Sequence, residues 1–327
     1  MAILSKEFEK LIAENSTQSE AYLVTDIPKF QQHKLGISEF GLPSFFILCD
    51  KVDESCMDYR LEMIDIQSGR NCQLLIDSKE KITGVYTIIS LKSDMLQVLD
   101  YFLDAIFLLI TNLPLTVKSK ELGSELERLA RLFNKFSLPA TNTIQGLWAE
   151  LLIIELSKNP IYLVNSWHYK SNDKYDFNDG VDKIEIKSTS GERRVHNFSL
   201  DQLNPNVNSN LVISSVLVKR TGYGKSVFEL TRSIERRLLN NEDILRFREM
   251  VASTLGVDFY SASEVFYDYQ FAVDNLAHYD YQSIPRIKSI DIPRSVTNVK
   301  FSCDLTGLDE FSIGSLDSKL INCLMKI

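Results

Sequence analysis

The sequence predicts an α/β protein, α+β overall, with a β-rich N-terminal domain, a central core of helices and strands, and a mixed C-terminal extension. Residues 20–92 alternate between strand-forming runs and turn residues. Helical periodicity then dominates up to residue 157, and residues 182–219 return to alternating or continuous apolar runs. We therefore expect the three parts to span residues 1–115, 116–240 and 241–327.

The N-terminal part is expected to contain short strands followed by two helices. The strands are Ala21–Thr25, Phe45–Cys49, Tyr59–Ile66, Cys72–Ile76 and Val85–Leu91, and the helices are Ser93–Leu113 and Lys118–Phe136. Gln67-Ser68-Gly69 has the composition of a turn between two of these strands. Target recognition, dimerisation or docking to a partner are the roles we consider for this domain.

A strongly apolar helix is expected over Asn142–Ser157. Its apolar residues recur at steps of three and four, and the opposite side is apolar too, which predicts a buried helix. Glu150 lies inside this apolar stripe. A buried glutamate costs several kcal/mol unless a cation or hydrogen bonds satisfy it. Glu150 is therefore either held by an internal salt bridge or cap, or directed at a metal ion.

Asp176 and, nine residues later, Glu185-Ile186-Lys187 form the most informative pattern of the chain. If Ile186 faces a core, the period of two places Glu185 and Lys187 together on the opposite face of a strand. Mg²⁺ prefers oxygen ligands and takes one or two carboxylates, and a nearby cation stabilises developing negative charge. The pattern thus suits phosphodiester hydrolysis, although a solvated strand face with an ion pair is the alternative.

Other acids compete for the role given to Asp176. Asp173, Asp179 and Asp182 lie close by, and spacing together with the aromatic flanks favours Asp176. Asp179-Gly180 instead has the composition of a tight turn. A similar acid-x-Lys triplet, Asp317-Ser318-Lys319, occurs elsewhere, so the pattern alone has limited specificity.

The order of elements around the triplet is more specific than the triplet itself. After the apolar helix, strands are expected at Ile161–Tyr169, Asp182–Ser188, Arg193–Phe198 and Asn210–Lys219. The segment Ser199-Leu200-Asp201-Gln202 resembles a capping box that opens a short helix before the last strand. Gln202 is accordingly either a cap partner alone or also a residue of the site.

This arrangement resembles the PD-(D/E)XK nuclease superfamily, and within it the bacterial "PD-(D/E)XK motif protein" family encoded beside restriction and phage-defence genes. The matching residues are Gly146-Leu147-Trp148-Ala149-Glu150-Leu151, Tyr175-Asp176-Phe177, Ile184-Glu185-Ile186-Lys187-Ser188-Thr189, Arg194-Val195-His196, Gln202-Leu203, Ile284-Pro285-Arg286 and Phe301-Ser302-Cys303-Asp304-Leu305. The resemblance implies a restriction-endonuclease-like α-β-β-β-α-β core. The chain departs from the family at Tyr175, where the superfamily name has proline.

The resemblance also implies the site. Asp176, Glu185 and the backbone carbonyl of Ile186 would ligate Mg²⁺, with Mn²⁺ as a substitute and Glu150 as a supplementary ligand. Lys187 would orient or activate the attacking water. The scissile phosphate would be lined by Arg194, His196 and Gln202. The implied activity is a metal-dependent DNA endonuclease that leaves 5′-phosphate ends, within a restriction-modification or phage-defence system.

The net charge of −8 and the pI of about 5.2 argue against a protein that coats nucleic acid. A bound cation reverses the sign locally at a cluster of acids. Basic residues gather downstream as a phosphate-contacting ridge or a solvated helix face, at Arg193, Arg194, Lys219, Arg220, Lys225, Arg232, Arg236 and Arg237. The tyrosines and phenylalanines between 260 and 281 are suited to base stacking or, more commonly, to packing.

Composition restricts the remaining classes. The longest apolar runs are too short for a membrane span, and Met1–Asn15 is amphipathic and lacks the features of a signal peptide. The five cysteines lack paired CxxC spacing, which favours reduced thiols in a cytoplasmic protein. We expect DNA as partner, a homodimer or larger defence complex, and a methyltransferase or ATPase partner. A non-catalytic DNA-binding or structural subunit and an RNase are the alternatives.

Overall fold

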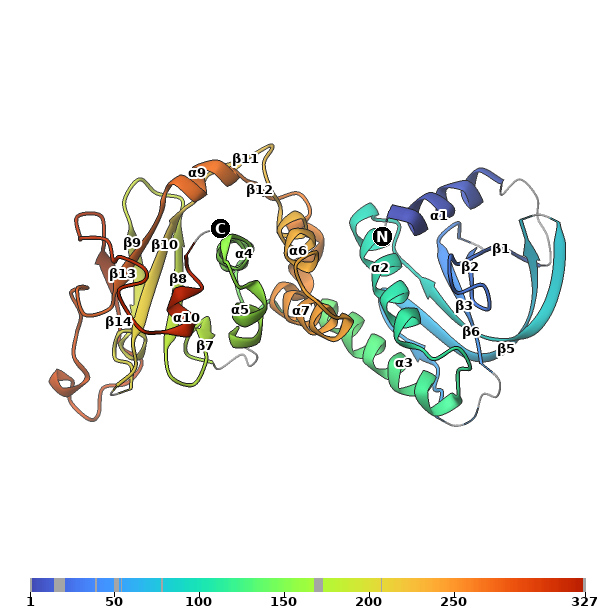
Figure 1. The fold of residues 1–327 in the computed structure, drawn as a ribbon, viewed down its shortest axis with the longest axis horizontal. Helices are drawn as coiled ribbons and strands as arrows, with labels where there is room; N and C mark the ends of the chain where they lie inside the picture. Colours follow the sequence, from blue (N-terminus) through green and yellow to red (C-terminus); the bar gives the residue numbers. More distant parts are fainter. Residues whose placement is uncertain are drawn as a thin grey trace. The chain divides into compact units, whose positions relative to one another are not determined.

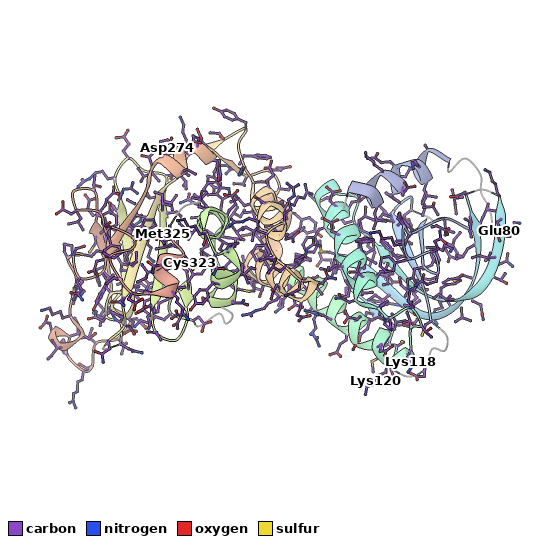
Figure 2. The ribbon with its side chains drawn as sticks, viewed as in Figure 1. Glu80, Lys118, Lys120, Asp274, Cys323 and Met325 are labelled. Carbon is purple, nitrogen blue, oxygen red and sulfur yellow. The ribbon has the colours of Figure 1, made fainter. Side chains whose placement is uncertain are left out.

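A computed structural model of the protein divides into two compact units, residues 1–138 and 139–327 (Figure 1). It describes residues 2–325 apart from 15–20, 39, 50–52, 54, 78, 168–172 and 207. Each unit has its own buried apolar residues, so the two are described separately (the side chains are drawn in Figure 2).

The first unit is a small β-barrel with helices packed on it. Strand β1 pairs antiparallel with β2 and parallel with β5, so β1, β2, β3, β6 and β5 close into a ring, which β4 extends at β5. The strands are β1 (Tyr22–Asp26), β2 (Lys34–Ile37), β3 (Pro43–Leu48), β4 (Tyr59–Arg60), β5 (Ile64–Ile76) and β6 (Glu80–Leu91), and the helices are α1 (Ala2–Glu14), α2 (Leu96–Asn112), α3 (Ser119–Asn134) and the 3-10 turn η1 (Lys135–Ser137).

Strand β3 connects the interior of the barrel with the helical layer, because its successive side chains point to opposite faces. Phe46 packs with Tyr86 at 6.3 Å between ring centroids, inside a cluster that includes Val24 and Leu74. On the other face, the ring of Phe45 lies 5.7 Å from that of Phe102 in α2. Both faces of this strand are therefore buried.

The sequence predicts most of these elements, with two differences. Where a turn is expected at Gln67-Ser68-Gly69, β5 continues through a bulge between Gln67 and Arg70, and Gly69 takes a φ of 65°. The pairing with β6 continues on both sides of this bulge, so the predicted turn is wrong. Strand β2 has no counterpart among the predicted strands.

The first unit also extends beyond the predicted boundary at residue 115. Helix α3 packs on α2. The turn η1 that follows α3 also contacts α2, through Phe136. The Tyr101 ring lies 6.1 Å from Phe133 and 5.4 Å from Phe136. These aromatic contacts hold residues 116–138 with the barrel rather than with the core that follows.

The second unit contains a sheet in the order β13-β10-β8-β7. Strands β8 and β10 are parallel, and each outer strand is antiparallel to its neighbour. The elements are α4 (Ile144–Leu156), α5 (Pro160–Ser166), β7 (Phe177–Asn178), β8 (Lys183–Thr189), β9 (Val195–Ser199), η2 (Leu200–Leu203), β10 (Leu211–Leu217), β11 (Arg220–Thr221), α6 (Val227–Glu235), α7 (Asn241–Leu255), η3 (Gly256–Asp258), α8 (Phe259–Ala262), β12 (Phe266–Tyr267), α9 (Tyr269–Asp274), β13 (Leu276–Asp280), η4 (Ser289–Asp291), β14 (Lys300–Asp304) and α10 (Lys319–Asn322).

Helix α4 is the buried centre of this unit. It packs on β8, α6 and α7, and every residue from Leu147 to Ile154 is buried. Thr143 accepts a hydrogen bond from the backbone N–H of Gly146 and so caps the start of the helix. At the other end, Arg237 donates to the carbonyls of Glu155 and Ser157, at 2.6 Å each. These contacts fix the helix that carries Glu150.

One predicted strand of the core is wrong. Over Ile161–Tyr169 the structure has helix α5, which begins at Pro160 with the side chain of Asn159 as its cap. Proline at the first position of a helix and asparagine before it are both helix-starting signals. His168 and Tyr169 lie outside the described residues.

The sheet also differs from a simple run of neighbouring strands. Strand β9 pairs with β14, not with β8, and the extension predicted over 241–327 supplies β13 to the sheet and α7 to α4. The predicted boundary at residue 240 therefore lies inside one compact unit.

A buried ion pair joins α6 to α7 in this unit. Arg248 donates from Nε and Nη2 to the two carboxylate oxygens of Glu235, at 2.7 and 2.9 Å, and both residues are buried. We expect Glu235→Ala to lower the free energy of unfolding by about 3–5 kcal/mol, because it leaves a buried guanidinium without its counter-charge. Urea unfolding followed by tryptophan fluorescence measures this unit, since Trp148 and Trp167 are the only tryptophans.

The matched control replaces both partners, as Glu235→Leu with Arg248→Met. Apolar side chains of similar volume often substitute for a buried ion pair with little cost. The double variant should therefore lose clearly less stability than Glu235→Ala. Equal losses would contradict the view that the unpaired charge is what destabilises the single variant.

Candidate active site

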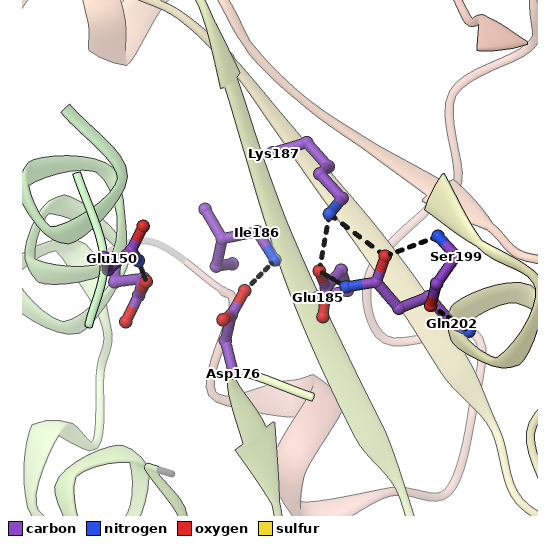
Figure 3. Close-up of polar contacts among 8 residues, drawn as sticks. Glu150, Asp176, Glu185, Ile186, Lys187, Ser199 and Gln202 are labelled. Atoms are coloured by element: carbon purple, nitrogen blue, oxygen red, sulfur yellow. Dashed lines mark hydrogen bonds and ion pairs between the residues drawn. The ribbon is translucent and has the colours of Figure 1, made fainter. Parts of the chain in front are cut away.

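Strand β8 places an acid and a lysine side by side. Lys187 Nζ lies 2.8 Å from Glu185 Oε1 (Figure 3), while Ile184 and Ile186 are buried on the other face. This is the arrangement that the period of two predicts. The Glu185 carboxylate is only 4% exposed and the Lys187 side chain 18%, so the pair is not the solvated surface ion pair that was the alternative.

Asp176 reaches the same strand from the residue before β7. Its Oδ2 accepts a hydrogen bond of 2.6 Å from the backbone N–H of Ile186 (Figure 3). Strand β7 is only two residues long and pairs with Lys183 and Ile184, so the edge of β8 is uncovered at Ile186. The N–H and C=O of one residue point to the same side of a strand, so we expect the Ile186 carbonyl to face Asp176 as well.

The competing acids have other partners. Asp179 accepts from the backbone N–H groups of Val181 and Asp182, which is the turn that its sequence predicts. Asp182 is buried and accepts from the backbone and side-chain nitrogens of Asn210. Asp176, in contrast to Asp179 and Asp182, is bonded to β8 beside the Glu185–Lys187 pair.

Glu150 projects from α4 on the far side of Asp176 from Glu185, as Figure 3 shows. It is buried and accepts hydrogen bonds from two neutral donors, Asn142 Nδ2 at 2.6 Å and Trp167 Nε1 at 2.7 Å. A Cβ on Gly146 would lie 2.5 Å from Asn142 Oδ1, so the glycine leaves room for this amide. Glu150 is thus held by neutral hydrogen-bond donors, where one predicted alternative is a salt bridge or a cap, and it also belongs to the acidic group.

Burial raises the pKa values of all three acids, and the Asp176 charge raises those of the two glutamates further. Burial and the charge of Asp176 raise the pKa of Glu185 to about 8, against the favourable contact with Lys187. Burial raises the pKa of Asp176 to about 6, and burial with the Asp176 charge raises that of Glu150. A cation bound here would offset these shifts, because the Asp176 charge and burial both favour the protonated forms of the glutamates.

The residues present fit a Mg²⁺ or Mn²⁺ ion. Glu185 Oε2 is buried and has no hydrogen-bond partner among the described residues, so one carboxylate oxygen is left for a ligand. Mg²⁺ needs one or two carboxylates and keeps several waters, which Asp176 and Glu185 would satisfy, with Glu150 next to them. In the described part of the chain, no group of three or more His, Cys, Asp and Glu side chains is arranged to hold a metal by itself.

Gln202 belongs to the cap of η2 and to the site. Its Oε1 accepts from the backbone N–H of Ser199 at 3.0 Å and from Lys187 Nζ at 3.3 Å. Its Nε2 donates to Glu185 Oε1 at 2.5 Å (Figure 3). Gln202 therefore makes the contacts of a cap partner and those of a site residue. The capping box fixes the amide that holds the Glu185–Lys187 pair.

Arg194 and His196 lie beside Lys187 but are hydrogen-bonded within the protein. Arg194 donates to the carbonyls of Ser215 and Asn275, at 2.8 and 2.9 Å. The His196 Nε2 atom lies 2.7 Å from Ser215 Oγ. Burial, with the charges of Lys187 and Arg194, lowers the pKa of His196 to about 4, so the imidazole is neutral at pH 7.

Three of these contacting residues were not singled out from the sequence. Asn142 and Trp167 hold Glu150, and Ser215 holds Arg194 and His196. Asn142 stands at the start of the predicted helix, which is the only local signal for it. Trp167 and Ser215 lie far from their partners along the chain, and no spacing rule indicates them.

Some side chains of the predicted basic ridge make contacts within the protein. Lys225 contacts Glu155 at 3.2 Å and lies over the Tyr269 ring, while Arg237 binds carbonyls at the end of α4. Tyr267 and Tyr279 are buried, and the Tyr267 ring packs on Trp148 at 5.0 Å. Packing, the more common of the two alternatives, accounts for these tyrosines. All five cysteines are free.

The chain belongs to the family described as "Putative PD-(D/E)XK family member", whose model matches residues 4–306. This family assignment confirms the resemblance to the PD-(D/E)XK nuclease superfamily. No curated protein and no solved structure matches the chain. Within the described residues, no helix is long and apolar enough to cross a membrane.

The raised pKa of Glu185 predicts how stability depends on pH. In EDTA, the folded protein keeps a proton on Glu185 up to about pH 8, whereas the unfolded chain loses it near its ordinary value of 4.5. The free energy of unfolding should therefore fall between about pH 5 and pH 8, by at most about 1.4 kcal/mol per pH unit for this group. Urea unfolding at several pH values measures the slope.

Glu185→Gln should remove the Glu185 part of this slope, because the amide does not titrate, while Asp176 and Glu150, whose pKa values are also raised, still contribute to the remainder. Asp317→Asn, which changes an exposed acid outside the site, is the matched control and should leave the slope unchanged. A slope that is the same in the wild type and in Glu185→Gln would show that Glu185 is ionised in the folded protein at neutral pH.

Proposed function

We propose that this protein is a Mg²⁺-dependent DNA endonuclease that hydrolyses phosphodiester bonds. The observation that carries the proposal is the buried Glu185 carboxylate with one unpartnered oxygen, between Lys187 on its own strand and Asp176 at the strand edge. A structural ion pair has no need of the other two acids beside it. Membership of the PD-(D/E)XK family supports the same chemistry.

In this mechanism, Asp176 and Glu185 would hold the metal, with Glu150 next to them. A bound Mg²⁺ would supply activation of a water and stabilisation of the leaving oxygen. Lys187 supplies a positive charge next to the attacked phosphate and orients the water. Gln202 keeps the ammonium in place, since its amide contacts both Lys187 and Glu185. Arg194 and His196 form the wall of the site beside Lys187, and they keep its strand partner Ser215 in position.

We further propose a place for this activity in restriction-modification or phage defence. Cleavage of both strands requires two such sites, so a homodimer or a larger complex is the expected assembly. A methyltransferase or an ATPase would be the partner that restricts cleavage to foreign DNA. The family match supports the nuclease class, and the genomic setting of the resembling family supports this role.

The test is cleavage of supercoiled plasmid DNA, methylated and unmethylated, with Mg²⁺ or Mn²⁺. We expect nicking by the wild type and a loss of at least about 100-fold in Asp176→Asn, Glu185→Gln and Lys187→Met, because each removes a charge that acts in the transition state. Folding of every variant is checked by tryptophan fluorescence before the assay.

The chain supplies its own matched control in the triplet Asp317-Ser318-Lys319, whose two charged residues are exposed. Asp317→Asn and Lys319→Met remove the same charges at the same spacing and should leave cleavage unchanged. Folded wild type that nicks no DNA and cleaves no RNA would contradict the proposal and would favour a non-catalytic DNA-binding subunit. Cleavage of RNA alone would keep the chemistry and change the substrate.

A further inference from the structure

A basic segment outside the site, residues 284–300, has no role in the mechanism above. It contains Arg286, Lys288, Arg294 and Lys300 but only one acid, Asp291, in a chain whose net charge is −8. Lys288, Arg294 and Lys300 are exposed. In the described part of the chain, none of the four basic side chains has an acidic partner; Arg286 donates to the Tyr281 and Gln282 carbonyls.

The backbone of this segment is attached to η2, the turn that carries Gln202. Asn204, which follows η2, donates from Nδ2 to the carbonyls of Leu200 and Ile287, at 2.7 and 3.0 Å. The backbone N–H of Leu200 donates to the Val299 carbonyl at 2.9 Å. Both ends of the basic segment are therefore fixed to the turn that positions the Glu185–Lys187 pair.

A further cation, from the stretch that carries Asp176, is bonded to the residue after η2. Lys174, two residues before Asp176, is exposed and donates to the Asn204 carbonyl at 3.2 Å. Tyr175, between them, donates from its hydroxyl to the Asp201 carbonyl at 3.2 Å. Cations of both chain segments thus meet at η2, a few residues from the candidate metal ligands.

Two cations of the other basic cluster are already used within the protein, although Lys219, Arg220 and Arg236 are exposed there. There, Lys225 is paired with Glu155 and Arg237 is used by the end of α4. Segment 284–300 presents exposed cations that release counterions when they meet phosphates, on a backbone that is already held in place. Little ordering entropy then opposes binding.

We propose that segment 284–300, together with Lys174, is the surface that binds the phosphate backbone of DNA next to the cleaved bond. This inference rests on the proposed function for the choice of DNA as the polyanion. The contacts are to phosphates, so they position the duplex without selecting a sequence. An acidic protein that binds here instead of DNA is the competing occupant.

The experiment measures binding of a fluorescently labelled 20-base-pair duplex by anisotropy in EDTA, between about 50 and 200 mM KCl. We compare the wild type with Lys288→Ala/Arg294→Ala, whose side chains are exposed. If each cation neutralises one phosphate, the slope of log K against log salt should decrease by about 1.8, and affinity at 0.1 M salt should fall about 60-fold.

The matched control is Lys79→Ala/Lys81→Ala, which removes two exposed lysines from the first unit. It changes the net charge equally and should leave the slope unchanged. Equal slopes for the wild type and Lys288→Ala/Arg294→Ala, equal losses in both double variants, or no binding of DNA by the wild type would overturn the inference. Altered binding without metal-dependent cleavage by the wild type would uphold it while contradicting the proposed nuclease activity.

Discussion

The second unit depends on one electrostatic constraint, a glutamate that is buried in a sheet strand beside two other acids. Glu185 is 3% exposed, and burial together with the Asp176 charge raises its pKa to about 8. Only Lys187 lies near enough to offset this within the strand. The surrounding elements must therefore hold these charges in place while leaving one oxygen of Glu185 unsatisfied, which a purely structural core would avoid.

Different elements meet this constraint in different ways. The shortness of β7 exposes the strand edge that Asp176 occupies, and the cap of η2 supplies the Gln202 amide that binds both members of the pair. On α4, Glu150 receives neutral donors from Asn142 and Trp167. Neutral donors hold the carboxyl in position without adding a counter-charge, so a cation would still be needed to favour its ionised form over the protonated form that burial favours.

The sequence predicts what depends on local periodicity. The period of two brings Glu185 and Lys187 together, the helical period buries Glu150, and the capping box places Gln202. It does not predict what depends on partners distant in the chain. Strand β9 pairs with β14 about a hundred residues later, and the turn expected at Gly69 is a bulge because β6 pairs on both sides of it. Helix α5 could have been predicted locally, because Asn159-Pro160 is a pair that starts helices.

An acidic protein that acts on DNA must attract a polyanion to a cluster of carboxylates. Long-range attraction is weak here, because the net charge is −8 and salt screens charges beyond about 10 Å. Short-range contacts must then supply the attraction for phosphates that the net charge does not supply. In the proposed nuclease, a divalent cation on Asp176 and Glu185 would reverse the sign at the centre, and the cations around η2 would do so at the rim. The acids of the site and the basic segment 284–300 would then act together: the acids hold the cation, and the segment offers exposed cations to the phosphates beside the cleaved bond.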